Sequence, residues 1–223
     1  MRLLAENISV ARGGQIFFSG ISFSLSSGEA LVVSGPNGVG KSTLLRVLAG
    51  LLPDAQGAVK LEGGPYETVA EASHYLGHHN GMKPELTVSE NLDFWQKFMI
   101  NEANAQDHRV LSVPDAVAAV GLEGVAHLPF GYLSAGQKRR IAMARLMTSF
   151  RPVWILDEPT AALDLASRHM FADLVEDQLE AGGMVIAATH QPLGFEKAQN
   201  LVLMPDEDAR LSHEDPFADP EAG

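Results

Sequence analysis

Hydrophobic positions in the first quarter of the chain follow strand spacing, then helix spacing, then strand spacing again. In residues 21–25, apolar side chains alternate with serines, and this period of two predicts a half-buried antiparallel strand. Residues 30–33 form a short continuous apolar run, which predicts a buried strand. Residues 41–52 place apolar side chains with helical spacing and predict a helix packed on a sheet, and residues 59–61 predict one more strand.

The middle of the chain has helical rather than strand-like spacing. Residues 87–90 fit a capping box and predict the start of a helix. Residues 112–115 repeat this kind of start before a short helix at 116–120, and residues 136–147 predict a third helix with one apolar side. No strand-like run interrupts this part, so a helical subdomain is expected at about residues 83–148.

The last third returns to alternating strands and helices. Residues 153–156 and 184–188 are continuous apolar runs of the kind found in parallel sheets. A helix is predicted between them at residues 166–180, and a final strand at residues 201–204. The predicted fold class over residues 1–204 is therefore α/β, with an antiparallel β part at the start and a helical subdomain inserted into the chain.

Composition narrows the classes of protein and site. Of the 223 residues, 46% are hydrophobic and 20% are charged, which is ordinary for a globular protein. The chain has no cysteine, which excludes disulfides and thiol-bound zinc or iron–sulfur sites. No apolar run approaches the eighteen or so residues of a membrane helix, so no direct membrane insertion is expected.

Negative charge is concentrated at the end of the chain. The formal net charge is −12, and residues 205–223 carry half of it, with seven acidic residues against one arginine. This segment also contains three prolines, so we interpret it as an acidic disordered tail that solubilises the protein. An acidic chain also argues against nucleic-acid binding, which needs clustered lysine and arginine.

A glycine-rich segment joins the predicted strand at residues 30–33 to the helix that begins at Lys41. Residues 35–42 read Gly-Pro-Asn-Gly-Val-Gly-Lys-Ser, and glycines at these positions let the backbone turn its N–H groups toward phosphate oxygens. Lys41 adds positive charge for the β- and γ-phosphates, and Ser42 offers a hydroxyl to Mg²⁺. A chance glycine-rich turn is the alternative, which the flanking strand and helix disfavour.

Two carboxylates follow the apolar run at residues 153–156. Asp157 is expected at the carboxyl edge of the sheet, where α/β folds bind ligands, and it can hold Mg²⁺ directly or through water. Glu158 can polarise a water molecule for attack on the γ-phosphate. An Asp-Glu pair is often only a solvated strand end, but the phosphate-binding loop earlier in the chain favours the catalytic interpretation.

Residues 133–137 read Leu-Ser-Ala-Gly-Gln at the start of a predicted helix. Ser134 and Gly136 can grip an anion with a hydroxyl and free N–H groups, but they have no evident role within one subunit. A second copy of this helix start, arriving from another subunit, would cover the γ-phosphate. A simple helix N-cap is the alternative, and the basic residues 138–140 are interpreted as a solvent-facing surface.

His190 follows the predicted strand at residues 184–188. A histidine there can hydrogen-bond the γ-phosphate and orient the attacking water, so it is the second catalytic candidate beside Glu158, although a lone histidine is more often structural. Asp164 is expected to report across the interface between two subunits.

Together these segments resemble the ATP-binding subunits of ABC transporters over residues 1–204. The motifs that match by position are the Walker A loop (35–43), the signature (133–137), Walker B (153–158), the D-loop (161–164) and the switch histidine His190. The resemblance implies that ATP is bound by Gly35, Pro36, Asn37, Gly38, Val39, Gly40, Lys41, Ser42, Thr43, Ser134 and Gly136. It also implies a P-loop ABC ATPase fold, Mg²⁺ held by Ser42 and Asp157, and hydrolysis that depends on Glu158, His190 and Lys41.

Finer features resemble the cytochrome c maturation protein A family, the ATPase subunit of a complex described as a haem exporter. The segments that carry this resemblance are residues 76–83, 85–87, 133–140 and 189–193. The resemblance implies a head-to-tail homodimer, a multi-span membrane subunit as partner, and a peripheral location at the cytoplasmic face of the bacterial inner membrane. It implies that ATP is used to release a haem-loaded chaperone.

Three positions depart from the common pattern of ABC ATPases. Ala135 stands where a second signature glycine is commoner, and its single methyl group should be tolerable. His79 stands where a glutamine that contacts Mg²⁺ is expected, and an imidazole could still accept a hydrogen bond from metal-bound water. Arg12 stands where an aromatic residue would stack on adenine, and a guanidinium can also stack on a base. Phe17 and Phe18 are alternatives for the adenine contact.

Other residues near His79 have competing interpretations. His74, His78 and His79 could suggest a haem or metal site, but the segment reads as strand and loop rather than as one helical face. The groove between the subdomains, near residues 79–95, is expected to contact the membrane partner. Core packing in the helical subdomain is the favoured interpretation for at least one of Phe94 and Trp95.

Two other functions stay open on the sequence. A soluble ABC-type ATPase acting on ribosomes or DNA would usually carry two ATP-binding cassettes or long insertions, and this chain has one cassette and no insertion. A nucleotide-gated binding module that does not hydrolyse ATP would have no use for Glu158 and His190.

Overall fold

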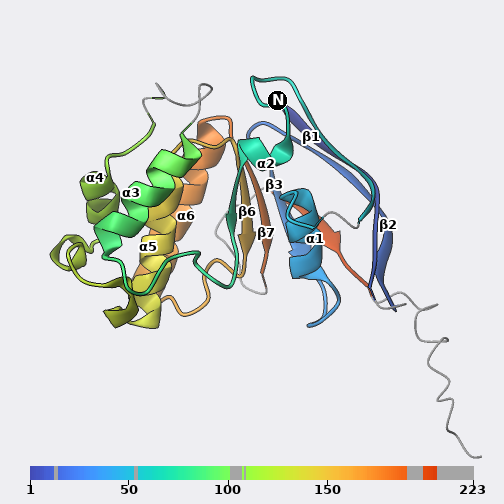
Figure 1. The fold of residues 1–223 in the computed structure, drawn as a ribbon. Helices are drawn as coiled ribbons and strands as arrows, with labels where there is room; N and C mark the ends of the chain where they lie inside the picture. The colour runs from blue at the N-terminus through green and yellow to red at the C-terminus, as the bar shows by residue number, and fades with distance from the viewer. Residues whose placement is uncertain (13–14, 53–54, 101–106, 108, 190–197, 205–223) are drawn as a thin grey trace, which may run out of the picture.

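The fold consists of two β-sheets and a group of helices. The computed structural model describes residues 1–12, 15–52, 55–100, 107, 109–189 and 198–204. The antiparallel sheet lies at one side, the parallel sheet in the middle, and helices α3 to α5 at the other side (Figure 1). This arrangement confirms the predicted α/β fold class with its antiparallel β part and inserted helices.

The antiparallel sheet has β1 in its centre. Its strands in spatial order are β2 (Gln15–Ser26), β1 (Arg2–Arg12) and β4 (Gln56–Glu62). Leu3 of β1 pairs with Leu25 on one side and with Leu61 on the other. Both Leu3 and Leu25 are fully buried, so this sheet presents one apolar face to the core.

The parallel sheet has the strand order β5, β6, β7, β3, β8. Its strands are β3 (Ala30–Ser34), β5 (Ser73–Leu76), β6 (Val153–Asp157), β7 (Met184–Ala188) and β8 (Ala198–Val202). Every residue of β6 and β7 is buried, because helices or sheet cover both faces. Their sequences are therefore continuous apolar runs rather than alternating ones.

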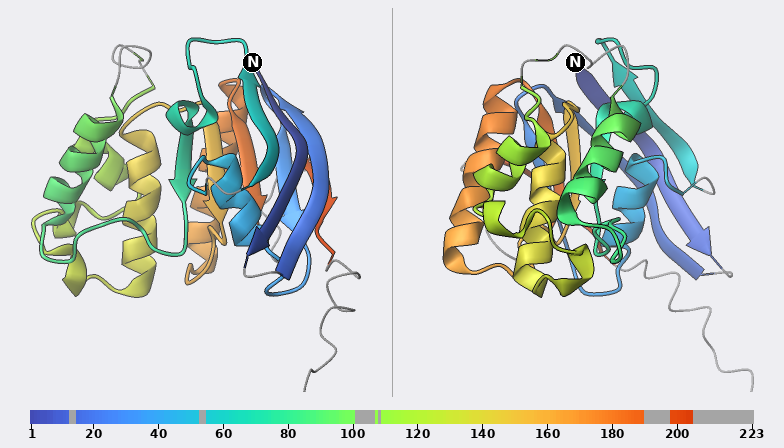
Figure 2. Two further views of the ribbon diagram at one scale, coloured as in Figure 1. Left: turned by 45° about the vertical axis from the view of Figure 1, so that its right-hand side comes forward. Right: turned by 60° about the vertical axis from the view of Figure 1, so that its left-hand side comes forward.

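Helices cover both faces of the parallel sheet. In chain order they are α1 (Lys41–Leu48), α2 (Val69–Ala72), α3 (Val88–Met99), α4 (Val113–Ala119), α5 (Ala135–Met147) and α6 (Leu165–Glu180), with short 3₁₀ turns at Glu123–Val125 and Phe130–Tyr132. Helices α3, α4 and α5 contact one another and lie in the chain between β5 and β6 (Figure 2).

Capping boxes begin two of these helices. At α3, the Thr87 side chain accepts from the backbone N–H of Glu90, and Glu90 accepts from the backbone N–H of Thr87. At α5, Ser134 and Gln137 make the same reciprocal pair. These pairs satisfy backbone donors that a helix otherwise leaves unpaired, which is why the starts could be predicted.

The structure corrects several predicted boundaries. The helix predicted at residues 41–52 ends at Leu48, because Gly50 adopts a φ of 69° and closes the helix while the N–H of Leu51 donates to Arg46 O. The last strand runs over Ala198–Val202 rather than 201–204. Strand β1 was not predicted. Its register with the neighbouring strands shifts between Ala5 and Ser9, so apolar and polar residues do not alternate regularly along it.

The two faces of the parallel sheet belong to two separate cores. Along β6, Val153 and Ile155 pack with α1 and the antiparallel sheet, whereas Trp154 and Leu156 pack with the other helices. β7 divides its side chains between the same two cores. The central strands thus hold both halves of the molecule together, and their carboxyl ends are fixed from both sides.

A histidine is buried in the parallel sheet. His74 of β5 is fully buried, and its Nε2 lies 2.7 Å from the carbonyl oxygen of Ser149. Burial lowers the pKa of His74 to about 3. The imidazole is therefore neutral at physiological pH and serves packing, while His78 and His79 are exposed. The three histidines do not share one site.

Acid should destabilise the protein through His74. The unfolded imidazole binds a proton below its ordinary pKa of 6.5, whereas the buried one stays neutral down to about pH 3. The contribution of the neutral His74 to the free energy of unfolding is therefore fully present above pH 6.5. It is lost as the pH falls toward 3, by at most about 1.4 kcal/mol per pH unit. Urea unfolding between pH 4 and 7 should show a shallower loss for His74→Gln. The exposed His127→Gln is the control, and equal slopes for His74→Gln and the unaltered protein would contradict this account.

The turn between β3 and α1 has space for a Cβ atom at one glycine but not at another. A Cβ at Gly35 would overlap the carbonyl oxygen of Leu203, whereas a Cβ at Gly38 meets open space, and both glycines have positive φ. Gly38→Ala should cost about 1–2 kcal/mol of unfolding free energy for its backbone conformation alone. Gly35→Ala should cost roughly 1–3 kcal/mol more because of the overlap. Urea midpoints without nucleotide test this difference, and equal losses would refute it.

Candidate nucleotide-binding site

The glycine-rich loop curls around the lysine that follows it. Lys41 Nζ donates to the carbonyl oxygens of Gly35 at 2.8 Å and Pro36 at 3.0 Å. Gly35, Gly38 and Gly40 all have positive φ, which lets the backbone fold back over the ammonium group. The segment thus forms a cradle around a buried cation, as binding of phosphate oxygens requires.

Helix α1 begins at this cradle with an anion-binding character. Its N-cap is Gly40, which provides no side-chain cap, and its first turn contains no acidic residue. The N-terminal N–H groups and the helix dipole are therefore available to an anion. A Cβ at Gly40 would lie 3.0 Å from the Phe18 ring, so the antiparallel sheet closes over the loop.

Asp157 and Glu158 lie where β6 ends. Asp157 is 6% exposed, and Glu158 is half-buried with a φ of 44°, which is unusual for a residue with a side chain. The N–H of Glu158 donates to Ala188 O at 2.9 Å, so the end of β7 supports this bend. Both carboxylates thus lie at the edge of the sheet from which the glycine-rich loop also leaves.

The residues predicted to hold Mg²⁺ fit that ion chemically. Ser42 in the first turn of α1 and Asp157 offer a hydroxyl and a carboxylate oxygen from the same edge of the sheet. Mg²⁺ is commonly bound by one or two protein oxygens together with substrate phosphates. Among the described residues no group of three or more His, Cys, Asp or Glu could hold a metal ion.

The signature segment lies on the other side of the sheet from the glycine-rich loop. The start of α5 and the loop before α1 are at the same end of the molecule, but β6 and β7 stand between them (Figures 1 and 2). Ser134 is exposed, and as the N-cap of α5 its side chain accepts a hydrogen bond from the Gln137 N–H. A Cβ at Gly136 would lie 3.3 Å from Ala162 O, so the signature packs on the segment after Glu158.

A buried arginine that the sequence pattern does not reveal joins these segments. Arg139 is 6% exposed and donates to backbone carbonyls of the chain around Glu158 and of the loop after β5. The prediction that residues 138–140 form a solvent-facing surface is therefore wrong for Arg139. The helical spacing alone could not reveal this burial, because carbonyls from distant parts of the chain replace the solvent.

A second arginine of α5 fixes the same loop. Arg145 Nη2 donates to Tyr75 O at 2.6 Å, and the guanidinium lies 4.5 Å from the centre of the Trp95 ring. The Trp95 indole N–H in turn donates to Gly81 O at 2.8 Å. Burial lowers the pKa of Arg145 to about 10, so this side chain remains charged at neutral pH.

The other predicted site residues have mixed outcomes. His79 is exposed after β5, with its ring 5.5 Å from that of His78, and its role toward Mg²⁺ stays a prediction. Arg12 is the last residue of β1, and its side chain lies outside the described residues, as does all of His190. Asp164 caps α6 by accepting from the Ser167 N–H at 2.8 Å, and the hydrogen bonds from Ser167 lower the pKa of Asp164.

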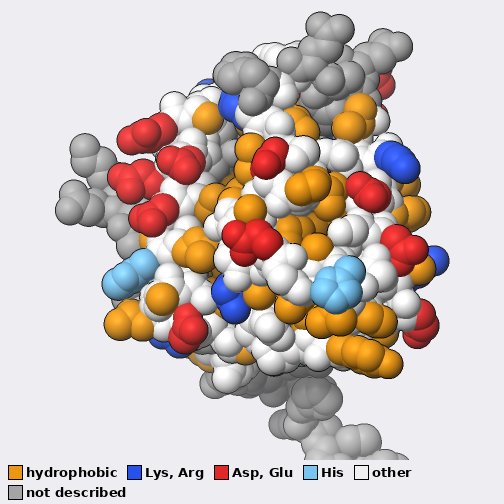
Figure 3. All heavy atoms as spheres, turned by 90° about the vertical axis from the view of Figure 1, so that its left-hand side faces the viewer, with side chains coloured by type: hydrophobic (Ala, Val, Ile, Leu, Met, Phe, Trp, Pro, Cys, Tyr) orange, Lys and Arg blue, Asp and Glu red, His pale blue; other side chains and the backbone are white. Residues whose placement is uncertain are grey.

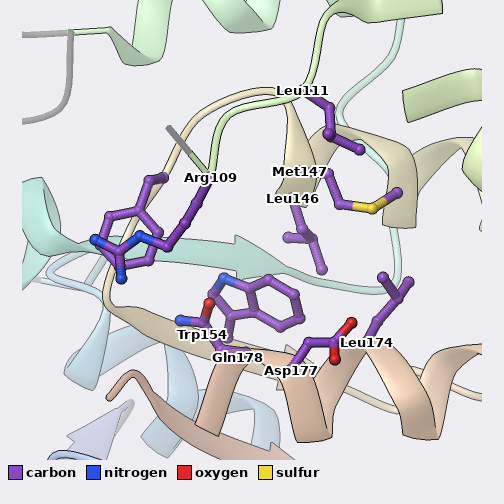
Figure 4. A pocket seen from close by; sticks show the side chains of 9 residues that line it. Arg109, Leu111, Leu146, Met147, Trp154, Leu174, Asp177 and Gln178 are labelled. Carbon is purple, nitrogen blue, oxygen red and sulfur yellow. The ribbon is translucent and has the colours of Figure 1, made fainter. Parts of the chain in front are cut away.

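A cavity of about 290 Å³ lies away from these residues, near the amino end of β6. Its walls are mainly apolar and come from α5, α6 and the loop before α4 (Figure 4). The indole of Trp154 forms one wall, and its buried N–H has no hydrogen-bond partner. Most of the apolar residues that line the cavity belong to the core on the side of α5 and α6, or pack against it, so the cavity is separate from the nucleotide site.

Comparisons with known proteins agree with this site. The ABC transporter family profile matches residues 18–161. The chain is 59% identical over 203 residues to the cytochrome c biogenesis ATP-binding export protein CcmA of Rhizobium meliloti, covering 90% of this chain and 97% of that protein. The protein of the same name from Brucella abortus is 56% identical over 199 residues, covering 89% of each.

Solved structures show the same fold. An ATP-binding protein from Pyrococcus furiosus, described as an ABC transporter component, superposes with a TM-score of 0.74 at 22% identity, covering 91% of this chain and 98% of that one. Within the described residues no helix combines the length and apolar character needed to cross a membrane. On the family match and the identities above, the chain belongs to the ABC transporter family and, within it, to the cytochrome c biogenesis ATP-binding export proteins.

Proposed function

We propose that this chain, the ATPase subunit of an ABC export complex for cytochrome c biogenesis, hydrolyses ATP with Mg²⁺ at two composite sites of a head-to-tail homodimer. The observation that carries this proposal is the separation of the glycine-rich loop from the signature by β6 and β7. Ser134 and Gly136 therefore reach a γ-phosphate only when they come from a second subunit.

Each half of the composite site has its own task. The cradle at residues 35–43 holds the phosphates through backbone N–H groups and Lys41. Ser42 and Asp157 would hold Mg²⁺, and the bound ion would neutralise charge on the phosphate oxygens. Glu158 accepts the proton of the attacking water, and His190 orients that water. The second subunit closes the site with Ser134 and Gly136.

The catalytic role of Glu158 can be tested with an isosteric change. Glu158→Gln keeps the shape of the side chain but removes the base, so ATP hydrolysis should slow by roughly 10²–10⁴ while ATP binding persists. Phosphate release measures the first quantity, and equilibrium binding of a fluorescent ATP analogue measures the second. Lys41→Ala is the comparison, because it should weaken binding itself. Near-normal turnover of Glu158→Gln would remove Glu158 from this role.

Exposed aromatic side chains on α3 form the proposed contact with the membrane partner. Phe94 is 54% exposed and Phe98 is 68% exposed, and their rings stack at 6.0 Å between centroids. Trp95 is half-buried and joins both of them by edge contacts. We expected core packing for at least one of Phe94 and Trp95; Phe94 does not fill that role, and Trp95 fills it in part because it is half-buried.

The position of this aromatic cluster favours a partner rather than chance exposure. The indole N–H of Trp95 donates to Gly81 O in the loop that follows β5. A displacement of α3 would therefore be transmitted to the loop that carries His79. The face that bears the helical subdomain shows hydrophobic side chains among acidic ones (Figure 3). Aromatic side chains of this kind are frequent energetic centres of protein interfaces. A multi-span subunit would hold the chain at the cytoplasmic face of the bacterial inner membrane.

Removal of the aromatic cluster should release the chain from its membrane partner. Phe94→Ser with Phe98→Ser should lower recovery of multi-span proteins about tenfold or more when tagged Glu158→Gln protein is captured from solubilised membranes with ATP. ATP binding should stay unchanged, since neither ring contacts the cradle. Leu51→Ser is the control, because Leu51 is an exposed apolar residue just after the end of α1. Undiminished recovery would place the contact elsewhere, and recovery of ribosomes or DNA alone would favour the soluble ATPase alternative.

A further inference from the structure

The guanidinium of Arg139 is surrounded by acceptors from two segments of the chain, residues 157–159 and the loop at residues 77–80. Nε donates to Pro159 O at 2.8 Å, and Nη2 donates to Asp157 O at 3.0 Å and to Glu158 O at 2.8 Å. Nη1 donates to Gly77 O at 2.9 Å and to Asn80 Oδ1 at 3.3 Å. Four of these acceptors are backbone carbonyls, so the side chain holds backbone directly, while the charges of Asp157 and Glu158 also attract the guanidinium.

The bonds to Asp157 and Glu158 act on both sides of one Cα atom. The carbonyl of Asp157 belongs to the peptide before the Glu158 Cα, and the carbonyl of Glu158 belongs to the peptide after it. The first of these peptides is held from its other end as well, because the Glu158 N–H donates to Ala188 O. Both peptide planes that flank Glu158 are therefore held, and with them the direction of its Cα–Cβ bond.

This restraint matters because the conformation of Glu158 is costly. Its φ of 44° lies in the left-handed region, which is unfavourable for a residue with a side chain. Such a conformation persists only where the surroundings hold it in place. Arg139 supplies that hold, and burial lowers its pKa only to about 10, so it stays charged at neutral pH.

The same guanidinium extends the restraint to the loop after β5. Gly77 and Asn80 border His78 and His79, and Arg145 on the same helix donates to Asn80 O in this loop and to Tyr75 O in β5. A shift of the loop relative to α5 would therefore disturb the bonds that orient Glu158.

We propose that Arg139 is the positioning residue of Glu158: it fixes the backbone on both sides of the base and ties that backbone to the loop at residues 77–80. The inference rests on the proposed role of Glu158 as general base. Lysine cannot replace the arginine, because an ammonium group cannot spread its donors over carbonyls on three sides as a planar guanidinium does.

Arg139→Lys tests the proposal through the rate of the chemical step. A displacement of the base by about 1 Å should lower kcat by roughly 10²-fold, while KM for ATP changes little because the cradle is untouched. Arg139→Gln, which keeps a planar donor, is the second variant, and thermal unfolding verifies that each is folded. Arg151→Lys is the matched control, since Arg151 is equally buried and donates to Met99 O.

A double-mutant cycle separates positioning from a general structural role. If Arg139 acts through Glu158, adding Arg139→Lys to Glu158→Gln should reduce the residual rate by less than about twofold. Full additivity, a normal kcat for both Arg139 variants, or an equal loss in Arg151→Lys would overturn the proposal. If the two effects are additive and Glu158→Gln hydrolyses ATP slowly, Glu158 keeps its role as general base and only the role of Arg139 is rejected. A normal rate for Glu158→Gln would reject both.

Discussion

Burial of β6 on both faces is the constraint on which the rest of the structure depends. Alternate side chains of this strand enter two different cores, so the strand joins the two cores. The strand ends at Asp157, and every element that reaches the site is anchored to it or to its neighbour β7. The functional edge is thus as rigid as the best-packed part of the molecule, which suits groups that must be held in place for chemistry.

Buried arginines are the second organising feature. Arg139, Arg145 and Arg151 each donate to backbone carbonyls from other segments, and burial lowers the pKa of each. A guanidinium can serve several carbonyls at once because its donors diverge in one plane. Two of these arginines lie on α5, whose first residues follow the signature serine. The helix thus links the signature, the loop after β5 and the end of β6 into one unit.

This link gives a physical basis for coupling between partner and site. The aromatic cluster on α3 is bonded through Trp95 to Gly81, and Arg145 packs against the same ring. A partner that moves α3 would therefore act on the loop that Arg139 connects to Glu158. The helix that follows the glycine-rich loop packs instead in the core with the antiparallel sheet.

The sequence alone determined the fold class and the starts of α3, α4 and α5, and it predicted the segments of the nucleotide site. Those features depend on local signals: strand spacing, capping residues at Thr87, Ser112 and Ser134, and glycines before Lys41. Only the tertiary structure decided that Arg139 is buried, that Phe94 is exposed and that β1 lies in the centre of its sheet. In each case the deciding contacts come from segments far apart in the chain. Periodicity reports the character of a residue and its neighbours, but not which distant carbonyl or strand will meet it.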